Sequence, residues 1–399
     1  MCYCRTVLVA ALFLTATLTS ALAAQGANWQ VSADSARAAA ERLVEFRASA
    51  KLGPFPEWKG AKVGDPTKYV GLDGQVRAYC FPVAKDKTVA GYVMVAASRF
   101  HMPLQEFGCS APPHTRANLE ACRKAAREAA GEGKELGVLR FAYLAPGLYA
   151  VEFPVLDKGQ SMGKVFVDVA SSQVIKDIGA HPKQEPGVAG AAGASAAWLA
   201  VANTKAAAKE SVKVQPEFKY IVNVPIMRRR TGPDSVAWAS VLNYWGIRKP
   251  REIPEFIAQQ LSESGVGSDS LQGFSRNRGF EVRLATRQRD AAPGGSRASF
   301  TDLRMETDAG RPFVVAMTNK SSSGNPVSST LAGAGYAVDE MGKWVIVHAG
   351  TTQAESVAQT DNSAPWCRPG VAFVNWECAV NTLRVTTMEV KRSIEKRTD

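Results

Sequence analysis

Histidine is scarce in this chain of 399 residues, which contains four, at positions 101, 114, 181 and 348. A zinc site needs three or four clustered His or Cys ligands, so this scatter predicts no metal site. No segment after the N-terminal apolar run reaches 18 apolar residues, and we expect no transmembrane segment in the mature chain. Aromatic residues are not interleaved with the basic ones as a base-stacking surface would need, so no nucleic-acid partner is expected. No cofactor is expected either.

The N-terminus does contain the pattern of a secretory signal. Arg5 is followed by an apolar run that ends in Ala21-Leu22-Ala23, a cleavage pattern with small residues at its first and third positions. We expect residues 1–23 to be removed, which predicts an exported protein, either periplasmic or secreted.

Export makes the cysteines informative, because disulfides persist in oxidising compartments. Beyond the signal the cysteines are Cys80, Cys109, Cys122, Cys367 and Cys378. Proximity in sequence predicts the disulfides Cys109–Cys122 and Cys367–Cys378. Cys80 lies in the apolar stretch RAYCFPVA and is expected to be a buried free thiol.

The formal net charge is +11, with basic clusters at 228–230, 248–251 and 276–289. Such clusters favour an anionic partner or form a solvated basic face, and the sequence leaves both open.

Hydrophobic periodicity predicts two α+β domains joined by a linker. Residues 28–182 combine helices near 32–50 and 115–131 with several strands. Residues 183–217 are rich in Ala and Gly and predict a linker whose second half is compatible with a helix. Residues 218–392 begin with three helices, near 235–245, 253–264 and 269–279, and continue with strands from 281 onward. Residues 393–399 are expected to form a C-terminal tail that carries Lys396 and Arg397.

The second domain carries, in order, TGPDSVAWASVLNYWG, a helix pair ending at a glycine, GRPFVVAM and LAGAGY. Over about 222–360 it resembles papain-superfamily cysteine peptidases, nearest the double-glycine (bacteriocin-processing) peptidase-like group. The first domain is similar to the propeptides of streptopain-like peptidases through VAGYVMVAASRFHMPLQEFG and GKVFVDVASSQVIKDI. The resemblance implies a two-lobed papain-like domain, a helical lobe followed by an antiparallel sheet lobe, with a ligand cleft between them.

The resemblance also assigns the positions of the catalytic residues, and none carries the family's residue. Ser235 stands at the nucleophile, or Thr231 in an alternative register. Arg229 stands at the oxyanion donor, Ser329 at the base and Ala349 at the orienting residue. A serine hydroxyl needs a general base within hydrogen-bond reach, and these positions provide none.

The roles of His348, Asp234 and three arginines near these positions can also be predicted. A Ser235–His348 dyad would restore a base, whereas strand alternation points His348 to the opposite face from Ala349, where it would make structural hydrogen bonds. Asp234 is expected to cap the helix N-terminus. The arginines Arg228, Arg229 and Arg230 either bind a carboxylate or another anion in the cleft or point into solvent.

We therefore expect an exported, catalytically inactive peptidase-like protein that binds a peptide or a protein partner in the cleft. One alternative is an active hydrolase that uses Ser235. Another is a protein that binds an anionic envelope polymer through its basic face.

Overall fold

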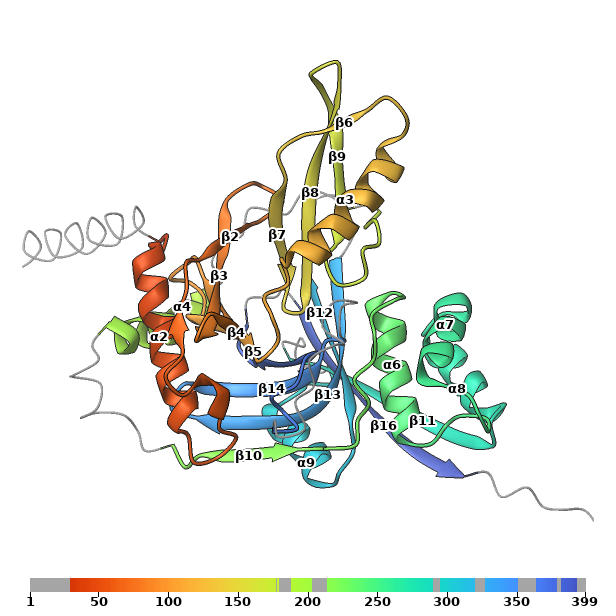
Figure 1. The fold of residues 1–399 in the computed structure, drawn as a ribbon. Coiled ribbons are helices and arrows are strands. Elements are labelled where there is room, and N and C mark those ends of the chain that lie inside the picture. The colour runs from red at the N-terminus through yellow and green to blue at the C-terminus, as the bar shows by residue number, and fades with distance from the viewer. Residues whose placement is uncertain are drawn as a thin grey trace, which may run out of the picture.

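A computed structural model describes residues 29–176, 178, 188–202, 214–289, 295–319, 327–350, 364–378 and 382–392. The predicted signal (1–23), the C-terminal tail (393–399) and a large part of the predicted linker lie outside the described residues. The fold is α+β, with seven helices and a 16-stranded sheet in the described part of the chain (Figure 1).

The first half of the chain contains two α-helices, one at its start and one after five strands, and each begins after a residue whose side chain caps it. The side chain of Ser32 accepts a hydrogen bond from the Ser35 amide at the start of one helix, and Thr115 does the same for the Asn118 amide at the start of the other. The elements in order are α2 (Ala33–Ser49), η1 (Pro56–Trp58), β1 (Lys62–Val63), β2 (Thr67–Val70), β3 (Val76–Lys85), β4 (Thr88–Ala96), β5 (Leu104–Gly108), α3 (Arg116–Ala130), β6 (Glu135–Leu136), β7 (Arg140–Ala145), β8 (Leu148–Asp157) and β9 (Gln160–Asp168).

The second half places helices before most of its strands, as the sequence pattern predicts. Its helix from Pro233 to Tyr244 is buried at every position from Ser235 to Leu242. The elements in order are α4 (Val188–Ala202), β10 (Glu217–Tyr220), α6 (Pro233–Tyr244), α7 (Pro254–Ser264), α8 (Ser268–Arg276), β11 (Phe280–Gln288), α9 (Phe300–Asp308), β12 (Phe313–Asn319), β13 (Val327–Asp339), β14 (Gly342–His348), β15 (Val371–Asn375) and β16 (Thr382–Arg392).

One sheet runs through both halves of the chain. Its strands follow the order β11-β16-β12-β13-β14-β15-β5-β4-β3-β2-β7-β8-β6, and all pairs are antiparallel except β2 with β7. The halves meet where β15 pairs with β5, in the register Phe373 with Phe107 and Val374 with Glu106. The junction between the halves of the sheet is therefore short.

The halves also share a hydrophobic core. Phe107 of the first half stacks on Phe373 of the second, with ring centroids 4.8 Å apart. Beside them, Arg47 of α2 forms a buried ion pair of 2.6 Å with Asp339 of β13. The two predicted domains thus pack into one another through apolar and charged contacts.

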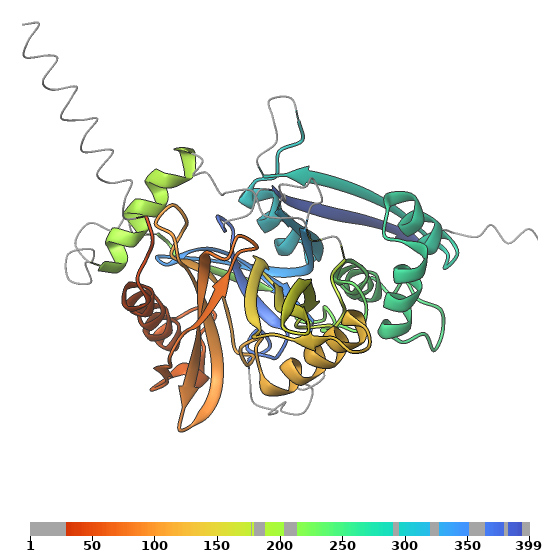
Figure 2. The same ribbon diagram turned by 90° about the horizontal axis from the view of Figure 1, so that it is seen from above.

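The predicted linker contributes a helix that belongs to this core. Trp198 and Val201 of α4 are buried in the same cluster as α2, and the Trp198 indole donates to the His101 carbonyl at 2.9 Å. Figure 2 shows α2 and α4 at one end of the molecule and α7 and α8 at the other. None of the helices in the described part has the length and apolar character that crossing a membrane requires.

Candidate functional site

Two of the four positions assigned to catalysis, Arg229 and Ala349, line a small cavity between the two halves of the chain, whereas Ser235 and Ser329 do not line it. Its volume is about 50 Å³. The first half contributes Glu106 and Gly147 to its wall, and the second half contributes Arg229, Ala349 and Gly350. This cavity is the candidate site.

Ser235 lies in the first turn of α6 and is buried. The helix begins here because Pro233 occupies its first turn, where a missing N–H costs nothing. The cap is Gly232, so the prediction that Asp234 caps the helix is wrong: Asp234 lies one position inside Pro233, within the helix. Ser235 makes no side-chain hydrogen bond to another described residue, so no base activates it in this arrangement.

Arg229 is buried and spans the two halves. Its Nη1 donates to the Gly147 carbonyl at 2.9 Å, and its Nη2 lies 3.2 Å from Asp168 Oδ2 at the end of β9. Only 1% of the Arg229 side chain is exposed. The guanidinium is therefore already neutralised by a carboxylate of its own chain.

Arg228 and Arg230 do not share this environment. Arg228 is partly buried, and Arg230 is exposed. The Arg230 carbonyl accepts a hydrogen bond of 3.1 Å from the Gln173 side chain, which again belongs to the first half. The three arginines thus do not converge as one anion site, and the loop that carries them contacts the first half.

The turn between β7 and β8 reaches this loop. Gly147 has a φ of +69°, and a Cβ there would meet Leu331 at 3.0 Å and Ser329 Oγ at 3.5 Å. Ser329 is buried on β13, and its hydroxyl has no hydrogen-bond partner among the described residues. Only glycine fits this place without strain.

Ala349 follows β14 and lines the cavity with Gly350. A Cβ on Gly350 would lie 3.3 Å from Arg229 Cβ and 3.7 Å from Val236 of α6. The segments that carry Ser235, Arg229 and Ala349 therefore meet at one point, and Gly147 brings Ser329 to the same place.

Glu106 of β5 is a site residue that the sequence patterns do not identify. Its carboxylate is fully buried and accepts hydrogen bonds from the hydroxyls of Tyr92 and Tyr149, and from the Gly147 amide at 2.9 Å. Burial raises the pKa of Glu106, and the three donors oppose that shift. The signal available in the sequence was a carboxylate inside the apolar segment LQEFG, since such a group needs buried partners.

Glu106 and Arg229 together hold the backbone of one residue. Glu106 binds the N–H of Gly147, and Arg229 binds its C=O. The arrangement pairs an anion with the backbone N–H of Gly147 and a cation with its backbone C=O.

His348 has partners other than Ser235. The Tyr220 hydroxyl lies 2.8 Å from its Nε2, and the Pro225 carbonyl 3.2 Å from its Nδ1. Burial lowers the pKa of His348 to about 4. Both ring nitrogens are engaged, and no hydrogen bond joins His348 to Ser235 in the described part of the structure.

The disulfide prediction is wrong for both pairs. The structure pairs Cys109 with Cys367, with a Cα–Cα distance of 5.2 Å and a sequence separation of 258. Pairing of β5 with β15 brings these distant segments together, whereas Cys122 and Cys378 point into the core as free thiols. Cys80 is buried and free, as predicted.

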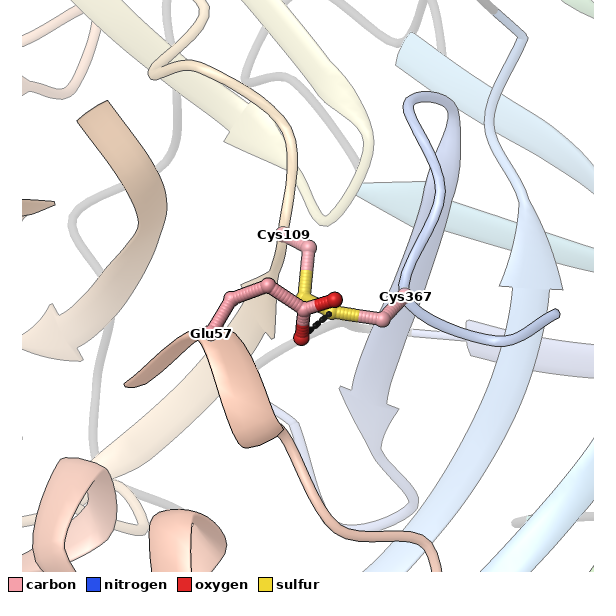
Figure 3. Close-up of side chains that lie close together, drawn as sticks. All are labelled: Glu57, Cys109 and Cys367. Atoms are coloured by element: carbon pink, nitrogen blue, oxygen red, sulfur yellow. Dashed lines mark hydrogen bonds between the residues drawn. A yellow bond between two sulfur atoms is a disulfide. The ribbon is translucent and has the colours of Figure 1, made fainter. Parts of the chain in front are cut away.

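Glu57 lies beside this disulfide. The ligand-type atoms of Glu57, Cys109 and Cys367 fall within 4.8 Å of one another, the one such group with three or more members in the described residues (Figure 3). Because the two sulfurs are bonded to each other, they are not thiolate ligands in this form.

Neither a scan against protein-family models nor a search of curated proteins returns a match to this sequence.

Proposed function

We propose that this chain is an exported, non-catalytic protein with a papain-like second domain, which binds a peptide or protein partner. The single observation that supports the proposal is a pair of hydrogen bonds to the backbone of Gly147: its N–H donates to Glu106, and its C=O accepts from Arg229. When the turn moves away from the cavity, the side chains of Glu106 and Arg229 are free to bind the N–H and C=O groups of a partner's backbone instead. Because backbone groups are common to all peptides, the side chains around the cavity would set the choice of partner.

The papain-like reading is supported by the meeting of the four assigned segments and by the order of helices and strands. The alternative, a hydrolase that uses Ser235, is disfavoured by the hydrogen bonds that engage His348. A general base contributes roughly 10²–10⁴-fold to rate, and such groups act as a unit with the nucleophile. The N-terminal signal pattern supports export.

Two reactive probes test the absence of catalysis. We expect the mature chain to take up neither a thiol-directed epoxide nor a serine-directed fluorophosphonate at the cleft, as measured by intact mass and peptide mapping. A stoichiometric adduct at Ser235 would establish the hydrolase alternative instead.

A second experiment tests binding itself. Gly147→Ala places a Cβ 3.0 Å from Leu331 in a left-handed conformation, which costs roughly 1–2 kcal/mol and should unseat the turn. Gly159→Ala is the matched control, because Gly159 has a φ of +80° and open space around it, in the next hairpin. We expect a displayed library of random peptides to be enriched on Gly147→Ala at least tenfold over Gly159→Ala. Equal enrichment on the two variants would contradict a binding role for this cleft.

A further inference from the structure

The Cys109–Cys367 disulfide lies next to the short junction between the halves of the sheet. Cys109 directly follows Gly108, the last residue of β5, and Cys367 precedes β15. Those two strands share the register pairs Phe107 with Phe373 and Glu106 with Val374. The covalent bond therefore lies beside the strand pair that joins the two halves of the sheet in the described part of the chain.

The same strand controls the candidate site. Glu106 stands three residues before Cys109 and holds the Gly147 amide in the cleft. A displacement of β5 away from β15 would move this carboxylate away from the turn. Breaking the disulfide is therefore expected to weaken the hydrogen bond between Glu106 and the Gly147 amide.

We propose that Glu57, Cys109 and Cys367 form a site of thiol–disulfide exchange whose reduction loosens β5 and releases the Gly147 turn from the cleft. The consequence for ligand access rests on the proposed function, whereas the exchange chemistry does not. The partner chemistry is a dithiol, either a small molecule or the active site of a redox protein.

The exchange consists of two displacements. A thiolate of the dithiol attacks Sγ of Cys109, which is the less buried of the two cysteines. The Cys109–Cys367 bond breaks, a mixed disulfide forms on Cys109, and Cys367 leaves as a thiolate and takes a proton from water. The second thiol of the reductant, as its thiolate, then attacks its partner sulfur, which closes the reductant's disulfide and leaves Cys109 as a thiolate that is protonated in turn. Two electrons and two protons pass from the dithiol to the protein.

Glu57 controls the rate of the first displacement. Its Oε2 lies 3.2 Å from Cys367 Sγ, the sulfur that must accept negative charge as it leaves (Figure 3). A carboxylate at this distance opposes a second negative charge, and a poorer leaving thiolate leaves more slowly. Glu57 therefore protects the bond against reduction.

The rate of reduction tests this role. Dithiothreitol is added to the oxidised mature chain, and samples are alkylated under denaturing conditions and weighed, so that oxidised protein carries three adducts and reduced protein carries five. We expect Glu57→Gln to be reduced about tenfold faster than the wild type. Glu120→Gln is the matched control, because it removes the same charge from an exposed ion pair on α3. Equal rates for wild type and Glu57→Gln, or equal acceleration by Glu120→Gln, would overturn the role of Glu57.

Hydrogen exchange tests the release of the turn. We expect reduction by dithiothreitol to speed exchange at least fivefold in peptides covering β5 and Gly147, and to leave α3 unchanged. A double variant, Cys109→Ser with Cys367→Ser, should reproduce that pattern without reductant. Uniform acceleration throughout the chain, or none at Gly147, would overturn the proposal. This measurement needs no ligand, so its outcome does not depend on peptide binding. If hydrogen exchange changes on reduction while Gly147→Ala captures no peptide, the thiol–disulfide site is supported and the binding role is contradicted.

Discussion

Arg229 is the residue whose replacement most directly tests the contact between the halves. Arg229→Gln removes the donor to Gly147 and leaves Asp168 without its cation, although both side chains are almost completely buried. Removing one partner of a buried ion pair costs roughly 3–5 kcal/mol. Asp168 keeps hydrogen bonds from the Ala170 amide at 3.1 Å and the Ser171 hydroxyl at 2.7 Å, so we expect about 3 kcal/mol, at the lower end of that range.

The measurement is equilibrium unfolding in urea, with Arg230→Gln as the control. Arg230 is the exposed neighbour in the same loop, and its substitution should change the free energy of unfolding by less than about 0.5 kcal/mol. Adding Asp168→Asn to Arg229→Gln neutralises the stranded carboxylate, so the double variant should regain about 1–2 kcal/mol relative to additivity. If Arg229→Gln cost no more than Arg230→Gln, the guanidinium would not be clamping the turn, and the reasoning about the cleft would be refuted.

Three further predictions concern the stability of the whole chain. Asp339→Asn leaves Arg47 without its carboxylate at the junction of the halves and should lower the free energy of unfolding by about 3 kcal/mol, in a single transition. Asp65→Asn, in an exposed ion pair, is the control and should lower it by less than about 1 kcal/mol. Two separated transitions in either variant would contradict a shared core. The pKa of His348 is lowered to about 4 in the folded state, so the unfolded chain binds this proton first and stability should fall as the pH drops from about 6.5 towards 4, by up to about 3 kcal/mol. His348→Gln should remove that part of the acid sensitivity in urea titrations at each pH, and an unchanged pH profile would contradict it. Glu106 should change stability with pH in the opposite direction. Because its pKa is raised in the folded state, the free energy of unfolding should fall as the pH rises above about 4.3, the value in an unfolded chain. Glu106→Gln should remove this part of the pH dependence.

Local signals in the sequence determined the elements and the class of fold. Ser32 and Thr115 set the starts of α2 and α3, since a cap acts on amides a few residues away. The alternation of apolar residues predicted the long strands, because the two-residue period of a strand is also a local property of the chain. The capping box of Ser299 and Asp302 marks the start of α9, a helix that the apolar pattern from residue 281 onward does not predict.

Tertiary structure alone decided the site and the disulfide. Glu106, Gly147 and Arg229 are far apart in the chain, and their meeting depends on how β5, the β7–β8 turn and the loop before α6 pack. Cysteine spacing favoured short loops, whereas the bond joins Cys109 to Cys367 because neighbouring strands bring them within reach. A sequence specifies the residue types available for such contacts, but pairing over hundreds of positions is set by the packing of the whole sheet, where each contact depends on all the others.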